Sequence, residues 1–320
     1  MKRVGVLLTM LVLLCACIQQ PASEPIRTPA PTAEAAPVVE LLVTSAPTDA
    51  VPIAVVERIA EPAAQPTIDP FAAHFSDEPN RTERSYIGRS ISVTVQSYAV
   101  DKTYGRHVTY HVADIYVRDV TAIRAEAARG DFGTHETRPV KEIAQRVGAL
   151  IAIGGDSYTR GKNSFVIRNG VLYRDKPIEN TDLCILYRDG TMETKQWGTF
   201  TVQEIVDADP WQVWGFGPAL LDENGKSMEI QHELMGHNPR TAIGYYEPGH
   251  YCFVVVDGRG ESVGVTLHSL SRLMEDLGCK VAYNLDGGAS ALLYWDGAIV
   301  SSPCSETRVI GDIIYLLPEE

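Results

Sequence analysis

The chain has 320 residues, a formal net charge of −13 and 45% hydrophobic residues. An acidic surface repels phosphate backbones, which argues against nucleic acid as a partner. The apolar content is ample for a packed core, and nothing in the sequence indicates repeats.

The first residues have the features of an export signal that ends in lipidation. Two basic residues precede the apolar run 4–14, which is shorter than the ~20 residues of a membrane-spanning helix. The run leads to Leu14-Cys15-Ala16-Cys17, a lipobox in which Cys17 is lipidated after cleavage. We expect a signal peptide at 1–16 and an extracytoplasmic protein held at the cell membrane by its lipid alone. The alternative is a signal peptide cleaved without lipidation.

A long polar segment follows the signal. Residues 18–70 contain ten of the nineteen prolines and no aromatic residue. Such a composition cannot bury enough apolar surface to offset its ordering entropy. Residues 17–84 are therefore predicted to be a disordered tether, followed by one domain at 85–320.

Short strand patterns begin the domain. Residues 90–98 and 109–118 are predicted strands, and Pro139 and Gly148 bound an amphipathic helix that precedes a buried, central strand at 149–153. Asn169-Gly170 and Asp189-Gly190 each separate two apolar runs, which predicts two hairpins.

The last third alternates strands with one helix. Strands are predicted at 251–256, 280–285 and 310–317, with a hairpin around Asp296-Gly297. Thr266 is suited to cap a helix that ends at Gly278. The pattern predicts an α+β domain with a mixed, largely antiparallel twisted sheet and two main helices.

Four cysteines remain besides Cys17. Cys184, Cys252, Cys279 and Cys304 permit two disulfides in an oxidising compartment, in any of three pairings. Buried free thiols are an equal alternative, because cysteine is among the most buried residue types.

Polar residues flanked by glycine lie at the ends of several predicted strands. Asn238 and Arg240 enter one strand, Asp257 leaves a second, and Asn284 and Asp286 leave a third. Rigid strands aim such groups, and glycine lets a ligand approach the backbone. Taken singly, each Asp-Gly also fits an ordinary turn.

In their order and spacing these segments resemble the phosphodiester glycosidase family. The resemblance rests on NPRTAIG (238–244), VVVDGR (254–259), AYNLDGGAS (282–290) and a late Arg308, with YHVADIYV, AIGGDSY and VWGFGPALL upstream. It extends from about residue 90 to 317. It implies a hydrolase for the bond between a sugar anomeric carbon and phosphate in a sugar-1-phosphodiester of the N-acetylglucosamine type.

The resemblance also implies roles for individual residues. Asp286 would act at the anomeric carbon as nucleophile, stabiliser or base, with Asp156 as a second carboxylate, Arg240 as phosphate clamp and His237 as general acid or phosphate ligand. Further substrate contacts would come from Asn284, Gly287, Gly288, Ser290, Asp257, Arg259, Arg308, Asn238 and Thr241. His111 and Asp114 are weaker candidates for the same cleft.

Two positions depart from the family pattern. Gly154 stands where bacterial relatives carry Asn, and Ala289 where the family carries a third glycine. The Asn would supply hydrogen-bonding groups, and a methyl is unsuited to positive φ or close ligand approach. Both changes predict altered substrate choice or reduced activity, with an inactive descendant of the family as the alternative.

The sequence is also compatible with two other functions. A non-catalytic envelope lipoprotein that binds phosphorylated glycans is one alternative, and a phosphodiesterase that breaks the P–O bond is another. No cofactor is expected, although a calcium ion held by Asp carboxylates is an alternative without an EF-hand pattern to support it. We expect a monomer whose partners are its phosphorylated glycan substrate and, through the lipid, the membrane.

Overall fold

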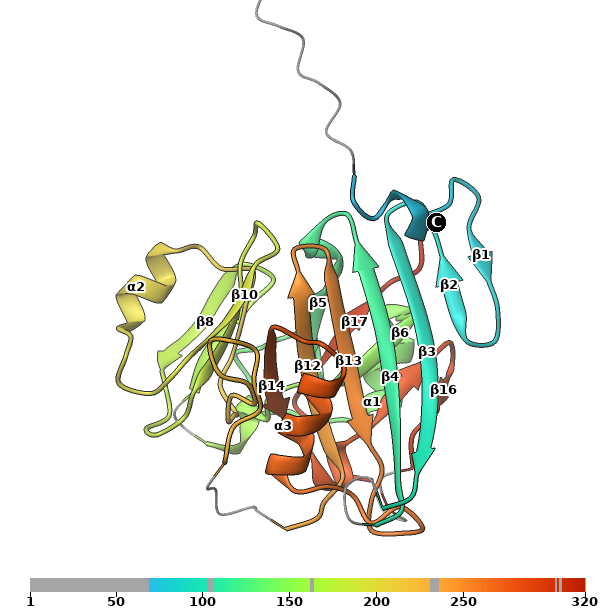
Figure 1. The fold of residues 1–320 in the computed structure, drawn as a ribbon. Coiled ribbons are helices and arrows are strands. Elements are labelled where there is room, and N and C mark those ends of the chain that lie inside the picture. The colour runs from blue at the N-terminus through green and yellow to red at the C-terminus, as the bar shows by residue number, and fades with distance from the viewer. Residues whose placement is uncertain are drawn as a thin grey trace, which may run out of the picture. The chain divides into compact units, whose positions relative to one another are not determined.

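The strands of this chain pair into three antiparallel sheets in the computed structural model (Figure 1). The structure describes residues 69–102, 106–161, 164–230, 236–302, 304 and 307–319, which belong to one compact unit. The predicted signal peptide, Cys17 and the tether as far as residue 68 lie outside the described residues.

The seven-stranded sheet carries most of the family-like segments. Its strands are, in spatial order, β1 (Asn80–Arg81), β2 (Ser85–Ile87), β3 (Ile91–Val100), β4 (Val108–Val117), β13 (His250–Val256), β12 (Arg240–Glu247) and β14 (Val281–Leu285). The register pairs Arg240 with Val256 and Thr241 with Leu285. The start of β12 therefore lies beside the ends of β13 and β14.

Two five-stranded sheets complete the β structure. The β6 sheet has the order β16 (Ala298–Ile299), β15 (Leu293–Trp295), β6 (Ile151–Gly154), β17 (Asp312–Leu316) and β5 (Arg124–Ala127). The β9 sheet has the order β10 (Met192–Lys195), β9 (Leu183–Leu186), β11 (Gln212–Trp214), β7 (Ser164–Arg168) and β8 (Val171–Lys176). Their inner faces and that of the seven-stranded sheet share one apolar core, to which Ile115, Phe253, Ile153 and Trp214 contribute.

Helices cover the outer faces of two sheets. α3 (Leu267–Asp276) packs Leu270 and Met274 against Val254 of the seven-stranded sheet, and Figure 1 shows it in front of β12 and β14. α1 (Val140–Val147) packs Ile143 against Ile313 of the β6 sheet. The seven-stranded sheet and the β6 sheet are therefore packed against apolar residues on both of their faces.

The α+β class is confirmed, and most predicted elements are present. Gly148 ends α1 with a φ of 68°, and Thr266 caps α3 by accepting from the Ser269 amide. Asn169 and Gly170 have φ values of 51° and 75°, the left-handed conformations that a tight hairpin needs. The predicted central strand is β6, third of the five in its sheet.

Two features of the predicted architecture differ. The single mixed sheet is three sheets, and all their pairings among the described residues are antiparallel. Periodicity along the chain indicates strands but not which strands pair, which explains the difference. A third helix, α2 (Val202–Asp207), is too short for a clear helical period, although its capping box of Thr201 and Glu204 signals a helix start.

The folded part begins before the predicted boundary at residue 85. The short 3-10 helix η1 (Ala72–His74) follows Phe71, whose ring centroid lies 5.3 Å from that of Tyr116 on β4. β1 pairs with β2. Phe71 is the first aromatic residue after the proline-rich segment, and its packing supplies the apolar contact that the tether composition lacks.

Cys184, Cys252 and Cys279 are buried free thiols. Cys252 and Cys279 lie together in the core under α3, with their sulfur atoms 3.7 Å apart. Gly244 leaves room for them, since a Cβ there would lie 2.6 Å and 2.7 Å from the two sulfurs.

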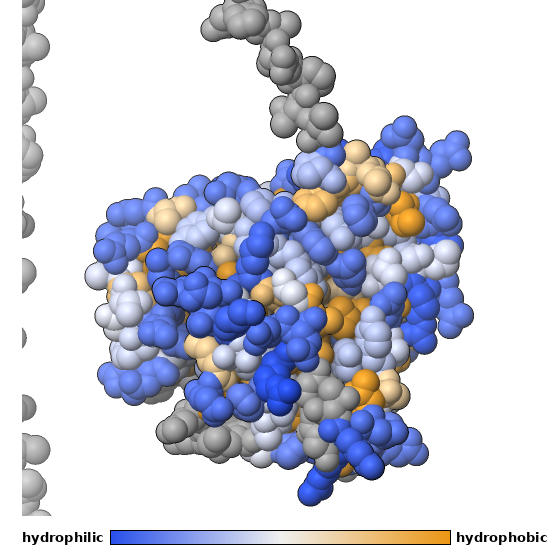
Figure 2. Space-filling model, viewed as in Figure 1, coloured by the Kyte–Doolittle hydropathy of each residue, from blue (hydrophilic) through white to orange (hydrophobic). Residues whose placement is uncertain are grey.

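On the face shown in Figure 2, most of the surface is polar.

Candidate active site

Four chain segments meet near the start of β12 and the end of β14. They are the residues before β12, the loop after β14, the segment of Arg308 and the loop after β6. The Gly288 amide donates to the Pro239 carbonyl at 2.8 Å, and the Arg308 amide donates to the Ala289 carbonyl at 3.0 Å. From the β6 sheet, the carbonyl of Gly155 accepts from the Asp286 amide at 3.1 Å. Backbone hydrogen bonds thus fix the predicted strand-end residues to one another.

An open cavity of about 240 Å³ lies among these segments. It is lined by Arg160, Phe216, Asn238, Arg240, Arg259, Asp286, Gly287, Gly288 and Arg308. Seven of these nine residues are predicted site residues; Arg160 and Phe216 are not. The described lining contains four guanidinium groups and one carboxylate, in a protein whose net charge is −13.

Asp286 is the carboxylate of the cavity, with a side chain only 5% exposed. Its Oδ2 accepts from the Ser157 hydroxyl at 2.8 Å and from Arg160 Nη2 at 3.1 Å. Its Oδ1 lies 4.0 Å from Arg308 Nη2. The carboxylate is therefore held through one oxygen, while the other faces the guanidinium group of Arg308.

Arg259 and Arg308 are held around Gly288. Arg308 donates to the Ser290 hydroxyl at 3.1 Å and to the Gly287 carbonyl at 3.2 Å, while Arg259 donates to Asn238 Oδ1 at 2.8 Å. Gly288 has a φ of 63°, and a Cβ there would lie 3.3 Å from Arg259 and 3.4 Å from Arg308. Glycine keeps the space between the two guanidinium groups open.

Arg240 is the buried cation of the group, at 4% exposure. It donates to the carbonyls of Val265 at 3.2 Å and Gly236 at 2.9 Å. Burial, and then repulsion from Arg259, lowers the pKa of Arg240 to about 10. The group is still a cation at neutral pH, and the arrangement keeps positive charges close together, as an anion-binding site requires.

The predicted catalytic Asp156 does not line the cavity. It lies 2.7 Å from Arg168, a fully buried residue of β7 whose Nε donates to Asp312 at 3.1 Å. The other Asp156 oxygen accepts from the Gly215 amide at 2.9 Å. In this place Asp156 anchors the loop after β6, which carries Ser157 and Arg160 to Asp286.

Asp312 shares that buried network. Burial raises its pKa to about 7, and the neighbouring Asp156 and Asp286 act in the same direction against the opposing effect of Arg168. Gly155 accommodates the carboxylate, since a Cβ there would lie 2.3 Å from Asp312 Oδ1. The sequence contains no motif that marks Asp312 or Arg168, because their pairing joins two sheets.

Asp257 and His111 do not line the cavity but are buried next to its segments. Asp257 Oδ2 lies 3.1 Å from His111 Nε2, and Asp257 Oδ1 accepts from the Ser302 amide at 2.7 Å. Both side chains are buried, so they fix the turn that leads to Arg259. Asp114 instead lies 2.6 Å from His250 Nε2, away from the cavity lining.

The other predicted residues take supporting or outlying positions. Asn284 is buried and donates to the Gly217 carbonyl at 2.6 Å, which holds the loop of Phe216. Thr241 is buried within β12, and Ser290 binds Arg308. His237 is exposed and is not among the lining residues.

The two departures from the family pattern fit this backbone. A Cβ at Gly154 would lie 3.2 Å from the backbone oxygen of Ser290, so a larger residue would push on the site segment. Ala289 is not among the residues with positive φ, and its methyl group causes no strain of that kind. Neither position obstructs the cavity.

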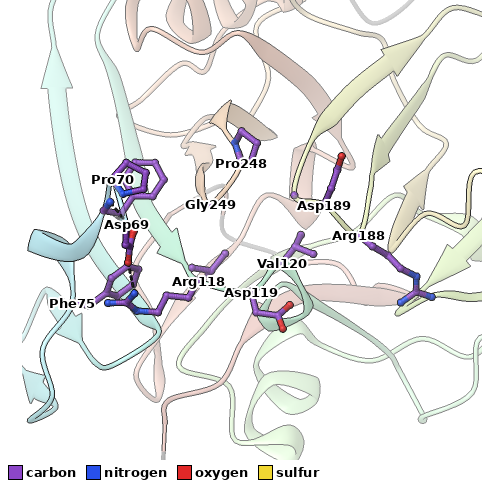
Figure 3. Close-up of a pocket in the computed structure, with 13 residues that line it drawn as sticks. Asp69, Pro70, Phe75, Arg118, Asp119, Val120, Arg188, Asp189, Pro248 and Gly249 are labelled. Carbon is purple, nitrogen blue, oxygen red and sulfur yellow. Dashed lines mark hydrogen bonds and ion pairs between the residues drawn. The ribbon is translucent and has the colours of Figure 1, made fainter. Parts of the chain in front are cut away.

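Two further observations concern other candidate sites. Within the described ranges, no three His, Cys, Asp or Glu side chains gather as metal ligands. A second cavity lies at the opposite end of β13, beside Pro248 and Gly249 (Figure 3). Its two guanidinium groups are already paired, Arg118 with Asp69 and Arg188 with Asp209 at 2.7 Å. The cavity that contains Asp286 and the residues of the family-like segments is therefore the stronger candidate.

Comparisons of sequence find a matching family model and distant relatives. The family model for the phosphodiester glycosidases matches residues 147–317. The SPbeta prophage-derived uncharacterized protein YomE of Bacillus subtilis is 26% identical over 200 residues, 59% of this chain and 31% of that protein. The N-acetylglucosamine-1-phosphodiester alpha-N-acetylglucosaminidase of Bos taurus is 29% identical over 133 residues, 36% of this chain and 25% of that protein. The matches thus span less than a third of either curated relative.

Comparisons of structure show the same fold in distant proteins. The catalytic domain of zebrafish N-acetylglucosamine-1-phosphodiester alpha-N-acetylglucosaminidase, auto-inhibited by its pro-peptide, gives a TM-score of 0.57 at 20% identity, over 77% of this chain and 87% of that chain. A hypothetical protein from Synechocystis gives a TM-score of 0.50 at 13% identity, over 72% of this chain and 62% of that one.

Proposed function

The chain belongs to the phosphodiester glycosidase family, and on that premise we propose that it hydrolyses the bond between a sugar anomeric carbon and phosphate in a sugar-1-phosphodiester. The observation that carries the proposal is Asp286, with one oxygen held and the other turned to Arg308, in a cavity that Arg240 and Arg259 also line. The names of the bovine and zebrafish relatives support N-acetylglucosamine as the type of sugar.

The guanidinium groups of Arg240, Arg259 and Arg308 would bind the phosphate. Guanidinium matches phosphate oxygens in a bidentate manner, and fixed cations stabilise the charge that develops on the leaving group. When the bond between the anomeric carbon and the phosphate oxygen breaks, the leaving group is a stable phosphate monoester. This leaving group needs less protonation than the alcohol that an ordinary glycoside releases. Asp286 is the one carboxylate among the described lining residues, which is consistent with a site that lacks a second carboxylic acid.

Asp286 Oδ1 would act at the anomeric carbon. Ser157 and Arg160 hold Oδ2 and fix the plane of the carboxylate. With phosphate bound to Arg308, the nearer carboxylate oxygen would be Oδ1, because it lies 4.0 Å from Arg308 Nη2. It would either attack the carbon or take a proton from the attacking water. Phe216 would supply an apolar surface for the sugar ring.

Hydrolysis in ¹⁸O-water tests the bond that breaks. We expect the label in the free sugar, because water ends on the anomeric carbon. Label in the phosphate would instead identify a phosphodiesterase. Absence of turnover with 1-phosphodiesters of N-acetylglucosamine and other common hexoses would favour a binding protein.

Substitutions test the residues. Asp286→Asn and Arg240→Ala should each lower kcat/KM by about 100-fold or more while the domain stays folded. Asp209→Asn and Arg188→Ala are matched controls, since these two residues form an exposed pair on the β9 sheet side. Rates of both site variants close to the controls would contradict the assignment.

The location of the enzyme is a separate proposal. The lipobox at Cys17 and the composition of 18–70 support an extracytoplasmic enzyme that a lipid holds at the cell membrane. In the described part of the chain, the helices are too short or too polar to span a bilayer. Mass spectrometry of the purified full chain should find a diacylated Cys17 at the N-terminus, and Cys17→Ser should release the protein from the membrane fraction. An unmodified N-terminus after Ala16 would contradict lipidation.

A further inference from the structure

Two buried cysteines meet under α3, and neither of them lines the cavity of Asp286. Their Sγ atoms lie 3.7 Å apart, although 27 positions of the chain separate the two residues. Cys252 belongs to β13, and Cys279 follows α3 and precedes β14. A disulfide joins its sulfur atoms at about 2 Å, so a small side-chain movement would bring this pair to bonding distance.

The backbone fixes the two cysteines relative to β12. Cys252 is paired in register with Gly244 of that strand. The Lys280 amide, next to Cys279, donates to the Tyr245 carbonyl of the same strand at 2.8 Å. The two sulfurs meet over Gly244, where a Cβ would lie 2.6 Å and 2.7 Å from them. A larger residue at this position would take the space of the sulfurs, so the glycine makes their contact possible.

The surroundings of the pair determine when a bond between the sulfurs can form. Both side chains are packed in an apolar cluster with Val254 and Met274. Hydrogen bonding to Cys279, and then burial, raises the pKa of the Cys252 thiol above its ordinary value. A disulfide is attacked by the thiolate and not by the thiol, so exchange is slow in the folded protein. Oxidation therefore belongs to folding, before α3 covers the two residues.

We propose that Cys252 and Cys279 form a disulfide when the chain folds in an oxidising medium, such as the compartment of the proposed location. The inference goes beyond the proposed function and does not depend on hydrolysis. The other reading of the contact is a pair of thiols that only fill the space over Gly244.

The oxidant would be a disulfide compound, either oxidised glutathione or the reactive disulfide of a thiol oxidant protein. The thiolate of one cysteine attacks this disulfide, which forms a mixed disulfide and releases one thiol. The thiolate of the second cysteine then attacks the mixed disulfide and releases the other thiol. The oxidant thus gains the two electrons and two protons that Cys252 and Cys279 lose.

The bond would close the chain between β13 and β14 into a loop that contains part of the candidate site. Arg259, which lines the cavity, lies in this loop. The loop also contains Val265, whose carbonyl accepts from Arg240 at 3.2 Å. A cross-link lowers the conformational entropy of the unfolded chain, which stabilises the folded form. The disulfide would therefore hold the segment that carries one guanidinium group and anchors another.

Peptide mapping after refolding tests the pairing. The full chain is reduced and unfolded, refolded in a mixture of reduced and oxidised glutathione, and then unfolded again in N-ethylmaleimide. Trypsin cuts after Arg259 and Arg272, so it places Cys252 and Cys279 in different peptides. Without reduction, mass spectrometry should find these two peptides linked as the main product. Alkylation or glutathionylation of both cysteines, or links from them to other cysteines, as the main product would overturn the inference.

Thermal unfolding measures the effect of the bond. The natural protein refolded in the glutathione mixture should melt about 5–10 °C higher than the same protein refolded with a reductant. Cys252→Ala and Cys279→Ala should each abolish this difference. Cys184→Ala is the matched control and should keep it, because Cys184 lies in the separate core between the sheets. The two conditions are compared within each variant, so the cost of lost packing cancels. Equal melting temperatures for the natural protein, or loss of the difference in Cys184→Ala, would overturn the inference.

Discussion

Asp312→Asn is expected to make the protein more stable at neutral pH. Arg168 is fully buried with two carboxylates, Asp156 at 2.7 Å and Asp312 at 3.1 Å. Burial raises the pKa of Asp312 to about 7 from its ordinary value of 3.8, and the neighbouring Asp156 adds to this rise because Arg168 is shared between the two carboxylates. Asparagine resembles the protonated acid in shape and carries no charge, so it avoids the cost of ionisation.

The size of the effect follows from the two pKa values. Between about pH 4 and pH 7 the folded protein binds a proton at Asp312 that the unfolded chain has released, so the stability due to this group falls as pH rises. Three pH units at ~1.4 kcal/mol each give a total loss of about 4 kcal/mol, of which about 3 kcal/mol falls between pH 5 and pH 8. Asp312→Asn should not show this loss.

Urea unfolding of both proteins at pH 5 and pH 8 measures the difference. The free energy of unfolding of Asp312→Asn, relative to the natural protein, should rise by about 3 kcal/mol from the lower to the higher pH. Asp175→Asn, at an exposed position of β8, is the control and should show no comparable change. A difference that stays constant with pH, or that falls, would refute the reasoning, because Asp312 would then be ionised throughout the range.

Three further substitutions test parts of the site. Phe216→Ala should raise KM about 10-fold with little change in kcat, measured with an N-acetylglucosamine 1-phosphodiester, because it removes apolar contact with the sugar. Ser157→Ala should lower kcat by about 10-fold in the same assay, since it removes the 2.8 Å hydrogen bond to Asp286; an unchanged kcat would mean that Arg160 alone orients the carboxylate. Gly287→Ala should cost about 1–3 kcal/mol in thermal or urea unfolding, because its Cβ would lie 2.8 Å from the Pro239 carbonyl oxygen, whereas Gly260→Ala meets nothing within 4 Å and should cost far less.

Local signals in the sequence predicted the elements well. The Asn169-Gly170 hairpin, the Gly148 stop of α1 and the Thr266 cap of α3 each depend on a few adjacent residues. Patterns of that length are visible without knowledge of the fold. The same holds for polar residues that directly follow a strand, such as Asp286, because the strand fixes where they lie.

Partners that come from distant segments could not be predicted. Asp156 follows a buried strand just as Asp286 does, and nothing local distinguishes the two carboxylates. The difference arises from Arg168 on another sheet, which pairs with Asp156 and removes it from the cavity. Arg160 and Phe216 reach the cavity from loops of the β6 and β9 sheets, and only the packing of these sheets against the seven-stranded sheet brings them to Asp286.

The cavity is preorganised for an anion because its cations cannot move apart. Arg240 is tied to the Val265 carbonyl, Arg259 to Asn238 and Arg308 to the Gly287 carbonyl. These anchors lie before α3, before β12 and after β14. Free guanidinium groups on flexible side chains would separate and reduce their repulsion. Here the repulsion persists in the free protein and is relieved when a negative charge binds. An anionic transition state gains most from such a fixed field, because no reorganisation is needed when its charge develops. The anchors that hold the guanidinium groups should therefore matter to the rate as much as the charges themselves.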